Sequence, residues 1–270
     1  MVVQHNMQAM NSNRMLGLTQ STLSKSTEKL SSGYRVNRAA DDAAGLAISE
    51  KMRRQIRGLT QASRNSQDGI SMVQTAEGAL NEVHDMLQRL NELAVQSANG
   101  TLVSSQDRVY VQLEVSQLIK EIDDVANNTK FNGISLLNVS TTVTLQVGTE
   151  ASHTMVISLQ SMTASGLGVN KISVSTQKLA GSAINVIKSA INDLNKLRAK
   201  LGAYQNRLEH KIANLDNVVE NTTAAESRIR DTDMATEMVK YSNSNILQQA
   251  GQSMLAQSNQ ANQGVLSLLG

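Results

Sequence analysis

The residues that most often carry enzymatic or metal chemistry are scattered through this chain. Its histidines lie far apart in the sequence, at His5, His84, His153 and His210. There is no HExxH or His-x-His pattern to place two imidazoles around one metal ion. The chain contains no cysteine, and it lacks the GxxxxGK phosphate loop and the GxSxG nucleophile elbow. We therefore expect no catalytic residue, no metal site and no cofactor.

Two acidic pairs and one basic stretch are the remaining candidates for chemistry. The pairs Asp41-Asp42 and Asp123-Asp124 could share a proton as general acid and base, but both flank helical stretches. Acidic residues at such places commonly favour a helix start or face solvent. The basic stretch from Arg53 to Arg64 has no interleaved aromatic side chains on which bases could stack. The chain also has 25 basic against 23 acidic residues, a balance that gives no excess positive charge for nucleic acid. We therefore predict that it does not bind nucleic acid.

The composition favours long helices over a pocketed enzyme. The 270 residues include no proline, one phenylalanine and four tyrosines, whereas an average chain of this length has roughly 13 prolines. Because proline ends or kinks helices, its absence leaves long helices uninterrupted. Ligand pockets are usually lined by aromatic and apolar side chains. Because this chain has few aromatic residues, an enzyme cleft is disfavoured. No apolar run approaches the roughly 20 residues of a membrane span, so we expect no membrane insertion.

Three segments carry the periodicity of helices that pack in a bundle. Apolar residues between 179 and 219 follow one another at alternating steps of three and four, which is typical of a coiled-coil-like helix. The seam positions are Ile184, Ile187, Ile191, Leu194, Arg198, Leu201, Gln205, Leu208, Ile212, Leu215 and Val219. Matching seams run from Leu80 to Ala94 and from Val111 to Val125. Three such helices can bury one another's stripes in an antiparallel bundle. A single helix over 44–99 would be about 80 Å long.

The period changes between about 129 and 175. Val143, Leu145 and Val147 alternate with polar residues, and a second alternation follows the turn-like segment 148–153. This pattern predicts a β-hairpin. The sequence thus predicts a mainly α fold: a long antiparallel coiled-coil-like helical bundle, or rod, with a small β-hairpin region at about 129–178.

Both ends of the chain are uncharged and rich in Asn, Gln and Ser. The first 13 and the last 30 residues contain no charged side chain, yet apolar residues recur there at helical spacing. A solvated terminal helix would normally carry charge, so we expect these segments to be buried against other copies and to be disordered in a free monomer. The candidate self-assembly residues are Met7, Met10, Ile246, Leu247, Met254, Leu255, Val265, Leu266 and Leu269.

Charge is distributed in blocks of opposite sign. Residues 35–64 carry seven basic and three acidic side chains, whereas residues 65–128 carry three basic and ten acidic ones. Such blocks can attract each other within one chain or between neighbouring copies. The blocks can equally be solvated helix faces whose charges differ in sign. The sequence does not decide between these two interpretations.

Several of these segments carry a family signature. The stretch from Leu30 to Ser49, LSSGYRVNRAADDAAGLAIS, closely resembles the N-terminal signature of bacterial flagellin. Further similar stretches occur at 59–65, 68–71, 201–209, 223–231 and 254–260. The resemblance covers about 1–138 and 179–270, which includes both halves of the chain.

The resemblance implies a secreted subunit that self-assembles into a helical homopolymer, the flagellar filament used for swimming. In the family the two chain ends pair in the inner core of the filament, here 1–42 with 230–270, while 43–229 would form the rod domain. The link between the matched halves is too short for an outer variable domain. The resemblance further implies an export chaperone, a filament cap and hook-junction proteins as partners. The N-terminus lacks the layout of a cleaved signal peptide, so we expect export to the extracellular flagellum by a route without one.

The resemblance also implies a receptor-binding patch. Family members are sensed by a host Toll-like receptor through a stretch similar to 88–96, with a glutamate like Glu114 nearby. Asn91 departs from the arginine often found in that stretch. The same surface could instead serve contacts between subunits in the filament. The residues that match the receptor pattern are Gln88, Arg89, Leu93, Gln96 and Glu114.

Two alternatives remain, one of the same structural class and one of a different class. The hook–filament junction protein resembles flagellin at its ends, but the signature here is unbroken in both halves. A secreted enzyme or adhesin built on the flagellin frame would need an inserted domain between about 139 and 178, and that span is too short for one. We therefore predict a structural protein and not an enzyme.

Overall fold

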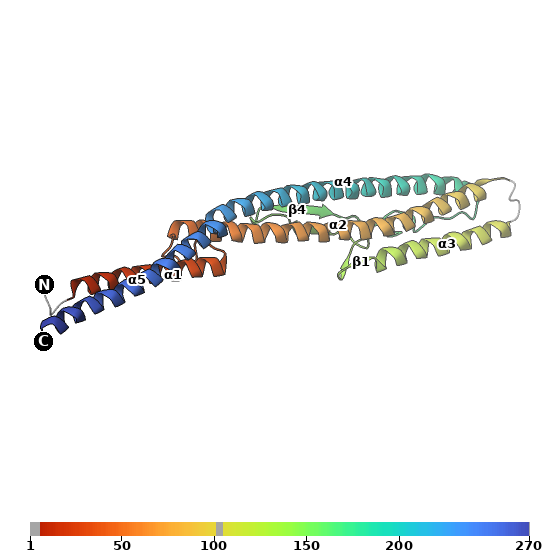
Figure 1. Ribbon diagram of the computed structural model, residues 1–270. Coiled ribbons are helices and arrows are strands. Elements are labelled where there is room, and N and C mark those ends of the chain that lie inside the picture. Colours follow the sequence, from red (N-terminus) through yellow and green to blue (C-terminus); the bar gives the residue numbers. More distant parts are fainter. Residues whose placement is uncertain (1–5, 101–104, 270) are drawn as a thin grey trace. The chain divides into compact units, whose positions relative to one another are not determined.

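The computed structural model describes residues 6–100 and 105–269, and within them the side chains of 6–100 and 106–260 (Figure 1). The helices are α1 (Met7–Ser32), α2 (Ala43–Ala98), α3 (Ser105–Asn128), α4 (Gln177–Arg230) and α5 (Met234–Leu269). The strands are β1 (Lys130–Phe131), β2 (Ile134–Ser135), β3 (Thr142–Gln146) and β4 (Thr154–Ser158). The predicted mainly α fold is confirmed, and so are the long helix predicted over 44–99 and the hairpin.

The chain forms two compact units. Residues 1–56 and 220–270 form the first, and residues 57–219 form the second. Helices α2 and α4 contribute to both units. These bounds describe packing within the chain. The assignment of 1–42 and 230–270 to a filament core remains a prediction, because it concerns packing between copies.

Helices α3 and α4 both run antiparallel to α2, and the three helices build the core of the second unit. Along α2 the fully buried apolar residues recur at alternating steps of three and four, at Val73, Ala76, Leu80, Val83, Leu87, Leu90 and Ala94. Hydrogen bonds mark the antiparallel directions: Ser97 Oγ donates to the carbonyl of Val174 before α4, and Ser63 Oγ to Asp216 near its far end. Burial of a large aliphatic side chain contributes about 1.5–3 kcal/mol, so this stripe holds the unit together.

The buried face of α4 differs from the predicted seam. Leu194, Leu201 and Leu208 are buried as expected, but Ile184 and Ile191 are only half-buried. The positions that complete the buried stripe are Ala180, Ala183, Ala190 and Leu197. The same cluster contains Leu137, Ile157 and Val169 from the region between α3 and α4. The buried face of α4 thus belongs to a core that also includes these residues, which the seam of one helix cannot indicate.

The hairpin β3–β4 packs against α2 at a glycine. Leu145 lies opposite Met155 in the antiparallel register. A Cβ atom added to Gly69 would overlap the end of the Leu145 side chain, so glycine leaves room for that side chain against the helix. A shorter hairpin, β1–β2, turns at Asn132 and Gly133, which both have positive φ. Asn and Gly are the residues that favour such a turn.

Helices α1 and α5 pack against each other in the first unit (Figure 1). They are antiparallel, because Asn6 Nδ2 donates to the carbonyl of Ser258, while Ser26 Oγ donates to Glu237 at 2.7 Å. The residues that face the partner helix recur at heptad spacing: Ala9, Ser12, Leu16, Thr19, Leu23 and Ser26 on α1, and Glu237, Tyr241, Ser244, Gln248, Gly251, Leu255 and Ser258 on α5. The predicted pairing of terminal helices is therefore present. We expected these ends to be disordered in a free monomer. In the structure, by contrast, residues 7–32 and 234–269 are helices.

Polar contacts fix the two connections that join these helices to the rest of the first unit. The guanidinium of Arg230 lies 4.5 Å from the centre of the Tyr34 ring and pairs with Glu50 at 2.8 Å. The backbone N–H of Thr232 donates to the carbonyl of Gly33, whose positive φ ends α1. These contacts tie the α1–α2 connection to the α4–α5 connection.

Three of the four carboxylates in the acidic pairs have structural roles. Asp41 accepts hydrogen bonds from the backbone N–H of Asn37 and Arg38, and the bond from Arg38 is the largest cause that lowers the pKa of this carboxyl. Asp42 accepts from the N–H of Gly45 in the first turn of α2. Asp123 accepts from the N–H of Ala164 at 2.7 Å. The carboxylates thus start a helix and hold a loop, as polar caps do.

Candidate functional site

The outer faces of α1 and α5 expose large apolar side chains. Met7 is 70% exposed and Ile246 is 63% exposed. Met10, Leu247 and Met254 are also exposed, whereas Leu255 is half-buried on the face toward α1. The side chains of Val265, Leu266 and Leu269 lie outside the described residues. Five of the predicted self-assembly residues therefore lie on the surface of the single chain.

This exposure follows from the composition of the paired face. The residues through which α1 and α5 face each other are mostly small or polar, with Ser26, Glu237 and Ser244 the most deeply buried. The apolar side chains are consequently left on the other faces of both helices. Scattered apolar residues are normal on a surface, but a contiguous group marks an interaction site.

A groove lies between the two helices on this apolar surface. Its volume is about 300 Å³, and it is lined by Asn11, Ser12, Met15, Leu16, Thr19, Leu247, Ala250, Gly251 and Met254. Gly251 permits the close approach, since a Cβ atom there would lie 3.3 Å from Leu16 Cδ1. The groove is large enough to accept an apolar side chain of another helix.

Sequence reasoning missed part of this surface. Leu18, Met238 and Val239 are exposed as well but were not assigned to assembly. Met238 and Val239 precede Lys240 in the chain. The absence of charge, which pointed to residues 241–270, therefore did not include them.

The receptor-like pattern contains a charged contact between α2 and α3. Arg89 donates to Glu114 through Nε and Nη2, at 2.9 and 2.8 Å, and to Glu92 at 3.0 Å. Glu114, followed by Glu92, raises the pKa of Arg89. About half of each side chain of the Arg89–Glu114 pair remains exposed, so water screens the pairing and its main effect is to fix the position of the guanidinium. Glu92 joins the contact through the i,i+3 spacing on α2.

The other residues of that pattern occupy different environments. Gln88 and Gln96 are exposed, and Gln88 Nε2 lies 2.7 Å from Nε2 of His84. Leu93 is only 1% exposed and belongs to the core of the second unit. Of the apolar residues in this stretch, Val95 is the one with an exposed side chain. The structure thus brings Arg89 and Glu114 together on the surface and leaves Leu93 beneath them.

The described residues include no group of three or more His, Asp or Glu side chains arranged to hold a metal ion. Among the helices of residues 6–100 and 105–269, none is long and apolar enough to cross a membrane.

Comparison with protein families matches nearly the whole chain. Residues 3–142 match the bacterial flagellin N-terminal helical region, and residues 184–269 match the bacterial flagellin C-terminal helical region. The chain belongs to the bacterial flagellin family. Membership makes it a structural filament protein and not an enzyme, as predicted.

Flagellins of similar length lie among its relatives. It is 52% identical to a flagellin of Halalkalibacterium halodurans and 49% identical to the flagellar filament 31.3 kDa core protein of Treponema maltophilum. Both comparisons cover 100% of each chain, so the short link between the two halves is shared with these flagellins.

Solved structures with a similar fold include a flagellin. A crystal structure of Bacillus cereus flagellin matches with 30% identity and a TM-score of 0.50, over 56% of this chain and 88% of that one. A flagellar hook-associated protein from Vibrio parahaemolyticus matches with a TM-score of 0.59 but 15% identity, over 71% of this chain and 100% of that one. At that identity the second likeness concerns the fold alone.

Proposed function

We propose that this flagellin is the self-assembling subunit of an extracellular flagellar filament that serves swimming. The observation that carries the proposal is the exposure of Met7, Met10, Ile246, Leu247 and Met254 on helices that already pair through their other faces. The relative in Treponema maltophilum is itself a flagellar filament core protein, which supports the same role here.

Burial of these side chains supplies a driving force for association. Removing a large apolar side chain from water is worth about 1.5–3 kcal/mol when burial is complete. Part of this gain offsets the loss of translational freedom and side-chain entropy on association. If one copy contacts the next through two different surfaces, the contact does not close, and repetition of one rotation and rise generates a helical filament. Under this proposal 1–42 and 230–270 lie in the inner core of the filament.

The same exposed surface accounts for the remaining proposed partners. Before assembly, apolar faces on α1 and α5 would favour premature association, so an export chaperone would cover them. A filament cap and hook-junction proteins would contact the two ends of the polymer. The flagellin resemblance implies these partners, and the exposed apolar faces of α1 and α5 support the proposal that they bind.

Removal of residues 241–270 tests the proposal. Truncation deletes most of α5 with Ile246, Leu247 and Met254, so we expect no filaments by negative-stain electron microscopy under conditions in which the full chain polymerises. The second unit, residues 57–219, has its own core and should keep its helicity by circular dichroism. Filaments formed by the truncated protein would refute the assembly role of α5. A full-length chain that never polymerises would refute the proposed function itself.

We further propose that the exposed patch around Arg89 and Glu114 is recognised by a host Toll-like flagellin receptor. The ion pair presents Arg89 in a fixed position on the surface, and Gln88 and Gln96 are exposed on the same helix. Fixed arginines often dominate the energetics of protein interfaces. The buried Leu93 would support this surface from below.

Substitution of Arg89 separates recognition from assembly. We expect Arg89→Ala to weaken receptor signalling in a cell reporter assay by about tenfold, because truncation of an interface arginine typically costs more than 1 kcal/mol. Filament assembly of the same variant, followed by electron microscopy, should be unchanged. The control is Arg53→Ala, which removes a half-buried arginine that is also paired at i,i+3. Unchanged signalling would refute recognition through Arg89, and loss of assembly without loss of signalling would assign the patch to contacts between subunits.

A further inference from the structure

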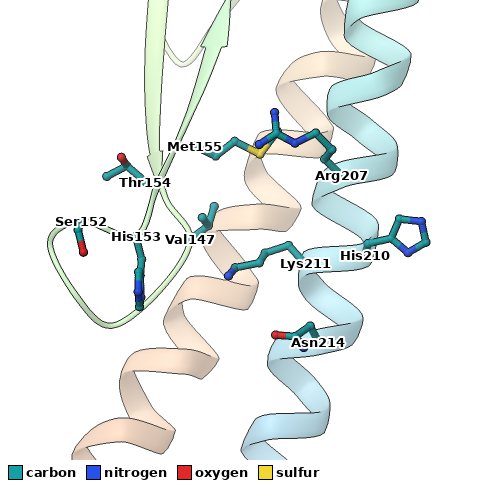
Figure 2. Close-up of a pocket in the computed structure, with 9 residues that line it drawn as sticks. All are labelled: Val147, Ser152, His153, Thr154, Met155, Arg207, His210, Lys211 and Asn214. Atoms are coloured by element: carbon teal, nitrogen blue, oxygen red, sulfur yellow. The ribbon is translucent and has the colours of Figure 1, made fainter.

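A cationic pocket lies between α4 and the loop that joins β3 to β4. Figure 2 shows the loop on one side and the helix on the other. The pocket has a volume of about 540 Å³ and is lined by Val147, Ser152, His153, Thr154, Met155, Arg207, His210, Lys211 and Asn214. None of these residues is acidic, and all belong to the second unit. Neither the bundle core nor the apolar faces of α1 and α5 account for this site.

The loop wall of the pocket is held in place by its own hydrogen bonds. The N–H of Val147 donates to the carbonyl of His153 at 3.0 Å, which closes the loop. The side chain of Gln146 donates to the carbonyls of Gly148 and Glu150 at 2.9 and 2.6 Å. A Cβ atom on Gly148 would lie 2.5 Å from that of His153, so the loop requires glycine there. The wall is therefore formed before any partner arrives, which lowers the entropic cost of binding.

The helix wall presents two cations one turn apart. Arg207 and Lys211 have i,i+4 spacing and therefore share one face of α4, and Figure 2 shows both extending toward the hairpin while His210 points away from it. The ion pairs of the described residues include neither of them. Two cations without a carboxylate partner in a concave site concentrate positive potential there and favour a negatively charged occupant.

The acidic part of the chain contains a pair that matches this site. Glu121 and Asp124 lie on α3 with i,i+3 spacing, and both are exposed. Neither belongs to an ion pair of the described residues. They are part of the block 65–128, which carries ten acidic against three basic residues. Two carboxylates one turn apart can meet two cations one turn apart when helices of two copies lie side by side.

We propose that the pocket lined by Arg207 and Lys211 receives Glu121 and Asp124 from a second copy of this chain. This inference rests on the proposed filament function and adds to it a specific charged contact between subunits. The apolar faces of α1 and α5 supply non-directional attraction, whereas complementary charges fix the register between partners.

A charge swap tests the contact. The double variant Arg207→Glu, Lys211→Glu places four carboxylates together at the interface, and we expect its rate of seeded filament elongation to fall by about tenfold or more, because like charges across an interface are strongly unfavourable. Adding Glu121→Lys and Asp124→Lys to the same chain should restore most of the rate. The control is Lys188→Glu, Lys200→Glu, which makes the same change of net charge at exposed positions on α4 outside the pocket.

The outcomes separate this inference from the function on which it rests. If the control and the pocket variant elongate equally well, the charged contact is refuted while the filament function stands. If the fourfold variant is not restored, Glu121 and Asp124 are not the occupants. If the unchanged chain itself does not polymerise, the proposed function falls and the inference with it.

Cross-linking gives a second test that does not depend on reversed charges. The chain contains no cysteine, so single-cysteine variants report one position each. Filaments copolymerised from Lys211→Cys and Asp124→Cys chains should yield disulfide-linked dimers on mild oxidation, whereas a mixture of Lys188→Cys and Asp124→Cys should not. Absence of the dimer in assembled filaments would overturn the proposal. A dimer formed instead with Asp85→Cys would move the acidic partner to α2 and overturn the assignment to α3.

Discussion

At the residue scale, a buried polar contact holds the terminal helices together. Glu237 is 5% exposed and accepts a hydrogen bond of 2.7 Å from the hydroxyl of Ser26, which is also buried. Lys240 lies 3.4 Å from the second carboxylate oxygen. The Ser26 hydroxyl is the largest cause that lowers the pKa of Glu237, and burial acts in the opposite direction. A buried carboxylate that keeps its charge must have such partners.

This contact makes the pairing of α1 and α5 sensitive to acid. The folded state lowers the pKa of Glu237, so its stabilisation is fully present above the ordinary value of 4.5 and is lost as pH falls through the lowered value. We expect Ser26→Ala to destabilise the pair by about 1.5–3 kcal/mol at neutral pH, since a hydrogen bond to a charged group is lost. Hydrogen exchange of the α1 and α5 amides measures this change.

The exposed neighbour Ser24 provides the matched control for this prediction. Ser24→Ala should leave exchange unchanged, and Glu237→Gln should flatten its dependence on pH below about 4.5, because the amide does not titrate in that range. If Ser26→Ala and Ser24→Ala have equal effects, the buried contact does not stabilise the pair.

At the element scale, the face that α4 turns to the core decides which residues matter for stability. Leu197 is 2% exposed, whereas Ile191, a position of the predicted heptad seam, is half-buried. The buried stripe includes three alanines, which let neighbouring backbone approach on that side of the helix. The heptad pattern located the helix correctly, but it assigned part of the buried face to positions one residue away from those that are buried.

Two alanine substitutions distinguish these faces. We expect Leu197→Ala to reduce the free energy of unfolding by about 2–5 kcal/mol, because it leaves a cavity in the core. Ile191→Ala removes a partly solvated side chain and should cost roughly 1–2 kcal/mol. Urea unfolding followed by circular dichroism compares the two variants in the full chain. A larger loss of unfolding free energy for Ile191→Ala than for Leu197→Ala would show instead that the predicted heptad seam forms the buried face.

At the scale of the whole molecule, the two compact units hold surfaces of different chemistry. The first unit exposes apolar side chains on α1 and α5, and the second holds an acidic pair on α3 and a cationic pocket against α4. Apolar burial gives association its strength but little direction, whereas paired charges reject misaligned partners. A subunit that repeats one contact along a filament uses both, because every copy must take the same register.

The sequence by itself determined which segments are helical and where the hairpin lies. Alternation at steps of three and four reflects the 3.6-residue period of the backbone, and alternation at steps of two reflects the pleated strand, so both can be read from neighbouring residues. The signature from Leu30 to Ser49 likewise identified the flagellin family before any contact was known. Asp42 could be predicted at a helix start because an N-cap is a local feature.

Only the tertiary structure decided which faces of these helices are buried. The receptor-like pattern does not show that its Leu93 lies in the core, nor that Arg89 meets Glu114 on a different helix. The apolar residues of α5 point outward because its small and polar residues complement α1, more than 200 positions away in the chain. The pocket beside Lys211 exists because a hairpin loop closes over α4. Each of these features depends on contacts between segments that are distant in sequence. The pattern within one segment does not indicate which other segment packs against it.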